Sequence, residues 1–190
     1  YTYQKEDKWD TKKFIKRIVM SSTYRQSSKI KKESLLIDSD NMYLSHYPRQ
    51  KLSAEMIRDN VLASSGMLVN KIGGPSVKPM QPPGLWDEVT GGGGGSLAFY
   101  TPDTGENLFR RSLYTFWRRT VPPPSMMIFD APTRDFCVAV RQKTSTPLQA
   151  LALMNDPQYL MAAEYLSKKI YEIKNMSKDD KIIKLYRTVT

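Results

Sequence analysis

The sequence predicts an all-α or mostly α fold, a single helical domain over residues 1–190 interrupted by a long Gly/Pro-rich loop. Three observations predict it. Apolar residues recur at helical spacing along most of the chain, and capping residues and prolines stand where these stretches begin. No convincing alternation of apolar and polar residues appears, except around Cys137 to Val140. With 190 residues and 40% hydrophobic content, the chain can bury the core of one domain.

The first predicted helix begins after a polar residue that can cap its N-terminus. Asp10 is a plausible cap for a helix over residues 11–27. In that helix Phe14, Ile18 and Val19 fall on one face, while lysines fill the other. The stretch is therefore an amphipathic helix.

Two glycines are expected to end the second predicted helix. Residues 29–50 mix charged residues with a proline, which indicates a loop with short turns. Ser53 then opens a strong helix over residues 53–72, although the acid of a capping box is missing. Gly73 and Gly74 follow directly and are good helix terminators.

Residues 73–100 are predicted to form an extended, flexible loop. The stretch contains eight glycines and four prolines, and the run Gly91–Gly95 is typical of a linker. A phosphate-binding glycine loop would need a strand before it and a helix with Lys-Ser or Lys-Thr after it. Neither is predicted here, so we interpret the glycines as a linker.

Residues 105–120 are predicted to form another helix, with Thr104 as its cap. At about 100° per residue, apolar side chains gather on one arc and arginines gather opposite. We expect the rings in the core and the arginines at the surface or against the following loop, where guanidinium groups pair well with carboxylates. The inward set is Phe109, Leu113, Phe116 and Trp117, and the outward set is Arg111, Arg118 and Arg119.

Prolines end this helix, and three more helices follow it. Residues 122–124 are prolines that cannot continue a helix, and we expect them to lead the chain out toward Asp130. Of the later helices, the first is capped by Ser145 or Thr146 and the second by Asp156, each with a proline at the first helical position. The stretch over residues 177–189 supplies a last, shorter helix, capped by Ser177.

The net charge of +10 does not indicate a specific nucleic-acid surface. Residues 1–32 carry a net charge of +7 and residues 165–190 a net +4, whereas residues 33–164 carry −1. Most of the excess is lysine spread over helical positions, which is typical of solvated faces, while phosphate binding needs a clustered patch. No run of eighteen apolar residues predicts a membrane span. We expect no specific nucleic-acid partner and no membrane span in this segment.

The chain contains no recognisable catalytic or metal-binding set. Cys137 is the only cysteine, so a zinc cage and a c-type haem attachment motif are excluded, and we expect its thiol to be buried as a small apolar group. His46 is the only histidine and cannot form a multi-histidine metal site. The stretch that begins at Asp38 lacks the glycine and the glutamate of a calcium loop. We expect no metal and no cofactor in this chain.

An indole and several arginines are the candidates for ligand or partner binding. Trp86 follows a proline-rich turn, where it can stack on a sugar ring, enter a partner or anchor the loop, and we favour the anchor. The candidate arginines are Arg110, Arg111, Arg118, Arg119 and Arg134.

An alternative function is a polysaccharide-active hydrolase that uses carboxylates near the long loop. Asp130 and Asp135 are its candidate catalytic residues, because two carboxyls at a suitable separation can hydrolyse a glycoside. The simpler interpretation is that these acids pair with arginines in a structural network, since a catalytic acid needs a raised pKa. The other carboxylates of the region are Asp87, Glu88, Asp103 and Glu106, and the arginines considered as partners are Arg110, Arg111, Arg134 and Arg141.

Five ordered motifs resemble the domain of unknown function 1553 family. They are "IVMSSTYRQSS", "LSAEMIRDNVLASSGML", "GGPSVKPMQPPGLW", "FRRSLYTFWRRTVPPPSMMIFDAPTRDFC" and "TSTPLQALALMNDPQYLMAA", and they cover residues 10–170 or so. The resemblance implies the C-terminal module of large secreted planctomycete and Bacteroidetes proteins, which often also carry cytochrome c modules. It provides no catalytic residue to assign here.

Because no catalytic set is recognisable, we favour a non-catalytic helical module. The resemblance implies that it belongs to a larger extracytoplasmic protein, whether periplasmic, outer-surface or secreted. Its expected contacts are other domains of the parent protein, a redox partner such as a cytochrome c module, or a polysaccharide, and any haem would lie on the other domains. Relatives commonly show two arginines followed by Thr-Asn-Thr-Pro, where this chain has "RQKTSTP" from Arg141 to Pro147. If the second arginine or the asparagine has a function in the family, this chain lacks the residue that performs it.

Overall fold

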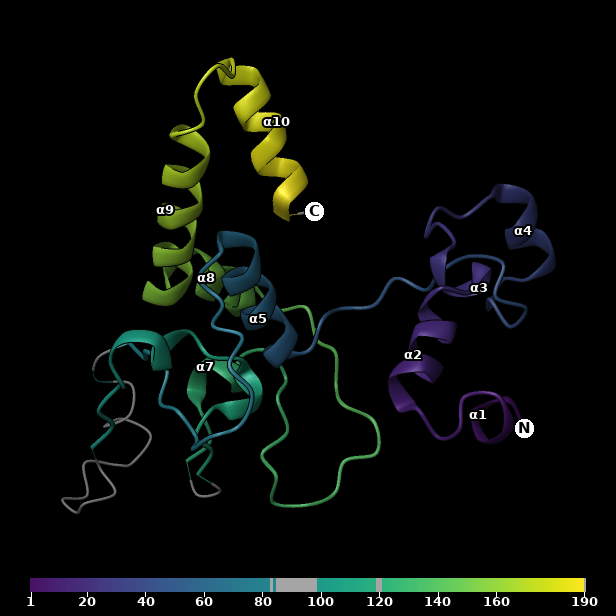
Figure 1. Ribbon diagram of the computed structural model, residues 1–190, viewed down its shortest axis with the longest axis horizontal. Coiled ribbons are helices and arrows are strands. Elements are labelled where there is room, and N and C mark those ends of the chain that lie inside the picture. Colours follow the sequence, from purple (N-terminus) through teal and green to yellow (C-terminus); the bar gives the residue numbers. More distant parts are fainter. Residues whose placement is uncertain (83, 85–98, 119–120, 190) are drawn as a thin grey trace. The chain divides into compact units, whose positions relative to one another are not determined.

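The computed structural model describes residues 1–82, 84, 99–118 and 121–189, and its elements confirm a mostly α fold (Figure 1). Within those ranges β-structure is limited to two isolated bridges. The chain divides into two compact units, Tyr1–Lys51 and Leu52–Thr190. The prediction of one domain over residues 1–190 stays a prediction, as does that of a flexible loop over 73–100, because most of residues 83–98 lie outside the described ranges.

The first unit contains four short helices. They are α1 (Thr2–Lys5), α2 (Thr11–Val19), α3 (Ser22–Arg25) and α4 (Lys32–Ile37). Asp10 caps α2 as predicted, since its carboxylate accepts the N–H of Lys13 at 3.1 Å. The prediction that this helix continues to residue 27 was wrong. The hydroxyl of Ser21 accepts the N–H of Tyr24 and so begins α3 as a separate turn.

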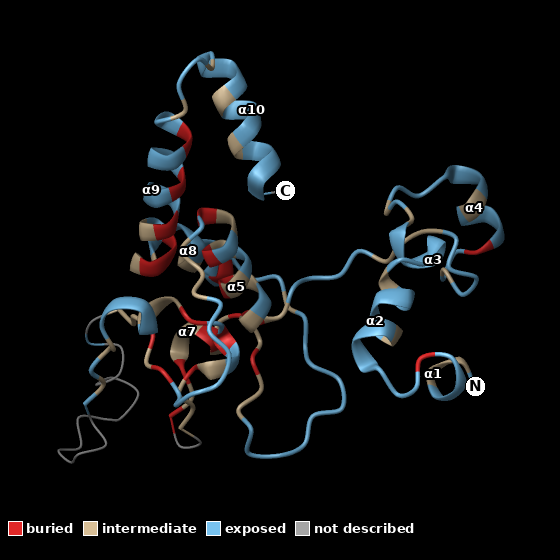
Figure 2. Ribbon diagram, in the orientation of Figure 1, coloured by how far each residue is buried: buried red, intermediate tan, exposed pale blue. Residues whose placement is uncertain are grey.

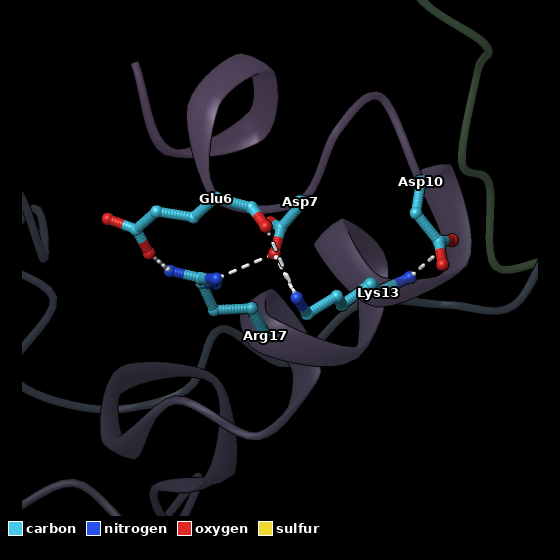
Figure 3. Close-up of polar contacts among 5 residues, drawn as sticks. All are labelled: Glu6, Asp7, Asp10, Lys13 and Arg17. Atoms are coloured by element: carbon cyan, nitrogen blue, oxygen red, sulfur yellow. Dashed lines mark hydrogen bonds and ion pairs between the residues drawn. The ribbon is translucent and has the colours of Figure 1, made fainter.

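An ion cluster fastens α1 to α2 (Figure 3). The guanidinium of Arg17 donates to Glu6 at 2.9 Å and to Asp7 at 2.7 Å, and the ammonium of Lys13 lies 3.3 Å from Asp7. Asp7 is buried, so its charge needs such partners to offset the loss of water. The cluster serves the fold of this unit.

The second unit is built around α5 (Ala54–Ser65) and α9 (Pro157–Tyr171). Buried residues follow one side of α9 and the inner side of α5, whereas α10 (Lys178–Val189) has none among its described residues (Figure 2). A core cluster joins these helices to α7 (Pro124–Met127). Its buried members are Ala54, Met126, Phe129, Ala131 and Tyr159.

Helix α5 begins at its predicted cap but ends earlier than predicted. The hydroxyl of Ser53 accepts the N–H of Met56. The helix then ends at Gly66, whose φ of +84° is left-handed, and not at Gly73 and Gly74. Glycine has no side chain and adopts this conformation at little cost. The helix therefore ends at the first glycine that follows its start.

The predicted starts of the three C-terminal helices are confirmed. Thr146 caps α8 (Pro147–Asn155) through a reciprocal pair of bonds with Gln149, and Asp156 caps α9 by accepting the N–H of Gln158 at 2.8 Å. Ser177 accepts the N–H of Asp180 at the start of α10. Each signal is local in sequence, which is why it could be recognised there.

The predicted helix over residues 105–120 was wrong. The chain forms two 3₁₀ turns, η1 (Gly105–Phe109) and η2 (Ser112–Tyr114), and Leu113 is 79% exposed where a core position was expected. Backbone groups that a helix would pair internally bind elsewhere: the carbonyl of Phe109 accepts the N–H of Val69, and the carbonyl of Tyr114 accepts the N–H of Val77. These tertiary bonds outweigh the helical pattern.

The segment after α7 also differs from expectation. The prolines do not lead straight into extended chain, because Pro124 opens the single turn of α7. Residues 137–140 form no strand, and Cys137 is exposed, although the sequence predicted a buried thiol. Residues 134–143 are all exposed, so no core is available there to cover the cysteine.

Candidate functional site

Four large apolar side chains face solvent at the end of α4 and in the turn after it. Leu36 and Ile37 close the helix, and Met42 and Tyr43 follow in the turn. All four are between 81% and 89% exposed. We name residues 36–43 the apolar loop. Large apolar side chains left in solvent within one short segment are typical of interaction sites.

A buried carboxylate holds the apolar loop in shape. Asp38 is only 8% exposed, and its two oxygens accept the N–H groups of Met42 at 2.6 Å and of Tyr43 at 3.0 Å. The backbone carbonyl of Asp38 accepts the N–H of Asn41 at 3.2 Å. The turn is therefore closed by its own polar groups, and its apolar side chains are presented outward.

Asn41 closes the other side of the same turn. Its φ is +56°, a left-handed value that asparagine tolerates better than most residues. Its side-chain amide donates to the carbonyl of His46 at 2.8 Å, and its side-chain oxygen accepts the N–H of His46 at 3.2 Å. Because these contacts exist within the unit, binding through the apolar loop would require little ordering of the chain.

The first unit combines this apolar surface with positive charge. Lys29, Lys31 and Lys32 are exposed just before and at the start of α4. Residues 1–32 carry a net charge of +7. The two buried residues of residues 1–51 are both acids, Asp7 and Asp38, so the large apolar side chains of this unit are left at least partly exposed.

Sequence reasoning did not identify the apolar loop as a site. It treated residues 29–50 as a loop with short turns and used the aspartates only to reject a calcium site. The available signal was the pair of apolar dipeptides, Leu36-Ile37 and Met42-Tyr43, on either side of "DSDN". Aspartate and asparagine favour turns, so this stretch indicates a turn with an apolar pair on each side.

Arg110, a predicted ligand-binding residue, is buried in the second unit. Its guanidinium donates to the carbonyls of Pro75 at 3.0 Å and of Lys71 at 3.2 Å, and also to that of Gly73. The ring of Tyr114 lies 3.9 Å from its Cζ. These contacts fold the chain after α5 against η2 and favour a structural role.

Arg58, which the sequence analysis did not single out, is the centre of a second buried network. Its guanidinium donates to the carbonyls of Leu108 and Arg110 and to the side chains of Gln158 and Ser112, at 2.7–3.2 Å. Burial lowers the pKa of Arg58, and the carboxylate of Asp59 at 3.9 Å opposes that shift.

A signal for Arg58 was present in the sequence. It lies on the buried face of α5, in register with Ala54, Leu62 and Ser65. Charged residues are rarely buried without a partner. An arginine on the same helix face as small and apolar residues therefore indicates a buried, hydrogen-bonded guanidinium.

The remaining predicted arginines lie in different surroundings. Arg111 is exposed. The guanidinium of Arg118 lies 5.8 Å from the ring of Phe116, and that of Arg134 lies 4.4 Å from the ring of Trp117. Two predicted residues, Trp86 and Arg119, lie outside the described residues. The predicted ligand role of these residues stays a prediction.

The two candidate catalytic acids also differ from each other. Asp130 accepts the N–H and the hydroxyl of Thr144 at 2.7 Å and 2.8 Å, and the amide of Gln149 at 3.4 Å. Asp135 is exposed. Of the arginines considered as partners, Arg141 instead pairs with Glu55 at 2.7 Å. The hydrolase alternative through Asp130 and Asp135 stays a prediction.

The part of the chain that the structure describes contains no group of three or more His, Cys, Asp or Glu residues placed to hold a metal ion. No helix in that part is long and apolar enough to cross a membrane.

The comparisons with known proteins give one match. Residues 3–190 match the model of the family PSD1, described as a protein of unknown function (DUF1553). No curated protein and no solved structure matches the chain.

Proposed function

The chain belongs to the DUF1553 family, and from this premise we propose that it is a non-catalytic module that binds another protein domain through the apolar loop. The observation that carries the proposal is the buried Asp38 carboxylate, which holds Met42 and Tyr43 by their backbone while both side chains stay in solvent. A turn that is internally bonded yet apolar outside is suited to recognition.

The partner we propose is a folded acidic domain of the same parent protein. The basic character of residues 1–32 favours an acidic surface, and methionine and tyrosine are enriched at the centres of protein interfaces. Following the family resemblance, we propose that the parent protein is extracytoplasmic and that a cytochrome c module is the companion domain. The haem would then belong to that module.

Methionine oxidation tests this proposal. The isolated chain 1–190 and the parent protein are treated with dilute hydrogen peroxide, and the oxidation rate of each methionine is followed by mass spectrometry. Met42 is 81% exposed and should oxidise rapidly in the isolated chain. In the parent protein we expect its rate to fall by about tenfold or more, because the partner excludes the oxidant.

Met154 on α8 is the internal comparison, because it is 70% exposed in the second unit. Local protection of Met42 with an unchanged Met154 supports the apolar loop as the binding surface. Equal oxidation of Met42 in both proteins would contradict the proposal. Slow oxidation of Met42 already in the isolated chain would assign the loop to a contact within this chain instead.

A double variant, Met42→Ser with Tyr43→Ser, complements the footprint. It keeps the backbone N–H groups that Asp38 accepts, so the turn should persist, while the apolar surface is removed. Binding of the chain to the separately produced companion domain should be lost. The matched control, Leu148→Ser with Met154→Ser on the exposed side of α8, should bind as the wild type does.

A further inference from the structure

One small cavity of the second unit is lined by three residues that each carry a buried polar atom without a partner. The cavity is lined by residues of the chain after α5, of the segment following η2 and of the start of α9, and it leaves about 10 Å³ in which the centre of a water molecule can lie. That is the space one water needs. The lining includes Gln81, Thr115 and Gln158.

Each of these three residues has a buried atom without a hydrogen-bonding partner in the protein. The atoms are the Oε1 of Gln81, the Oγ1 of Thr115 and the Nε2 of Gln158. Thr115 and Gln158 are each only 8% exposed. A buried polar group without a partner is costly and rare in folded proteins, so three in the lining of one cavity call for a common partner.

The orientation of Gln158 is fixed by its neighbour. Its Oε1 accepts the Nε–H of Arg58 at 2.8 Å, and because a guanidinium has only donors, the amide cannot be turned around. The NH₂ group of Gln158 is therefore the group that is left to donate. Gln81 donates through its own amide to the hydroxyl of Ser125 at 3.3 Å, which leaves its oxygen as an acceptor.

We propose that this cavity binds one structural water molecule. The water accepts a hydrogen bond from Gln158 Nε2, donates one to Gln81 Oε1 and makes a third with the hydroxyl of Thr115, which can donate or accept. Although Asp156 also lines the cavity, a cation does not suit the site, because Gln158 presents a donor there and the cationic Arg58 belongs to the same lining. The water would join three segments that are distant in sequence.

A crystal structure of the chain and water–protein NMR contacts test the proposal. We expect one density peak within hydrogen-bond reach of all three atoms, and a cross-relaxation signal between the side-chain amide of Gln158 and a long-lived water. Thr115→Val keeps the shape but removes one partner, so the signal should disappear. Thr101→Val changes an exposed threonine outside the cavity and should leave the signal intact.

A direct bond between the amides of Gln81 and Gln158 with no water peak would overturn the proposal, as would a peak with the short, many-oxygen coordination of a metal ion. If Thr115→Val does not fold, Gln81→Leu removes the acceptor instead, and the wild-type crystal structure decides by itself.

Discussion

The guanidinium of Arg58 donates to the backbone carbonyl of Arg110 at 2.8 Å, so one buried arginine fixes the backbone of another. Arg110 in turn holds the carbonyls of Lys71, Gly73 and Pro75. The two guanidiniums therefore donate hydrogen bonds to backbone carbonyls that lie outside α-helices and strands. Their charge is used to fold irregular chain onto α5.

Removing Arg58 should destabilise the second unit strongly. Arg58→Met keeps an unbranched, apolar stem but leaves the carbonyls of Leu108 and Arg110 without their donors, and we expect a loss of about 3–5 kcal/mol in the free energy of unfolding. Urea denaturation followed by circular dichroism measures it. Arg111→Ala, which changes an exposed arginine nearby, should stay within about 0.5 kcal/mol of the wild type. Similar losses for both variants would contradict the assigned role of Arg58.

The left-handed end of α5 should make Gly66 sensitive to replacement. Gly66→Ala puts a side chain at φ +84° and should cost about 1–2 kcal/mol, measured by thermal or urea unfolding. The new Cβ would lie 2.9 Å from the ammonium of Lys169, the movable end of a long side chain, so the cost comes chiefly from the backbone. Gly66→Asn should cost less, because asparagine tolerates this region. Equal costs for both variants would point to the contact with Lys169 as the cause.

Of the two neighbouring hydroxyl residues before α8, only one caps the helix. Thr146 caps the helix and Ser145 does not, so Thr146→Ala should cost about 1 kcal/mol and Ser145→Ala should stay within about 0.5 kcal/mol. Chemical denaturation of the two variants beside the wild type provides the comparison. A larger loss for Ser145→Ala would mean that the cap is placed one residue earlier in solution.

Asp156 should give the stability a dependence on pH. Burial raises the pKa of Asp156 above its ordinary value of 3.8, so the folded state holds its proton more tightly than the unfolded state does. The stability that this preference provides is present below that ordinary value and is lost as the pH rises through the folded pKa. Asp156→Asn keeps an oxygen that can cap α9 but does not titrate.

The variant should therefore gain stability relative to the wild type as the pH rises from about 3 to about 7, measured by urea unfolding across that range. A stability difference that does not change with pH would show that the carboxyl of Asp156 titrates equally in the folded and unfolded states.

Local signals account for the correctly predicted part of the fold. A capping residue followed by a proline fixes a helix start within a few residues, so Thr146 and Asp156 could be recognised from sequence. The residues around Arg110 could not. Their backbone groups bind Val69, Val77 and Arg58, all more than thirty residues earlier, and no window of sequence contains both partners.

The candidate site was missed for a related reason. Asp38 belongs to a segment whose composition indicates only turns, and its burial depends on accepting the N–H groups of Met42 and Tyr43. Sequence pattern tells which residues are apolar but not whether the fold covers them. The exposure of the apolar loop became visible only once the turn around Asp38 was known.

The exposed thiol of Cys137 gives the chain a unique attachment point for a fluorophore. In the sequence it lies between Arg134, whose guanidinium contacts the ring of Trp117, and Arg141, which pairs with Glu55. A maleimide dye placed there would label a surface segment, because residues 134–143 are all exposed. The cysteine that was predicted to be buried thus allows the chain to be labelled at a single site.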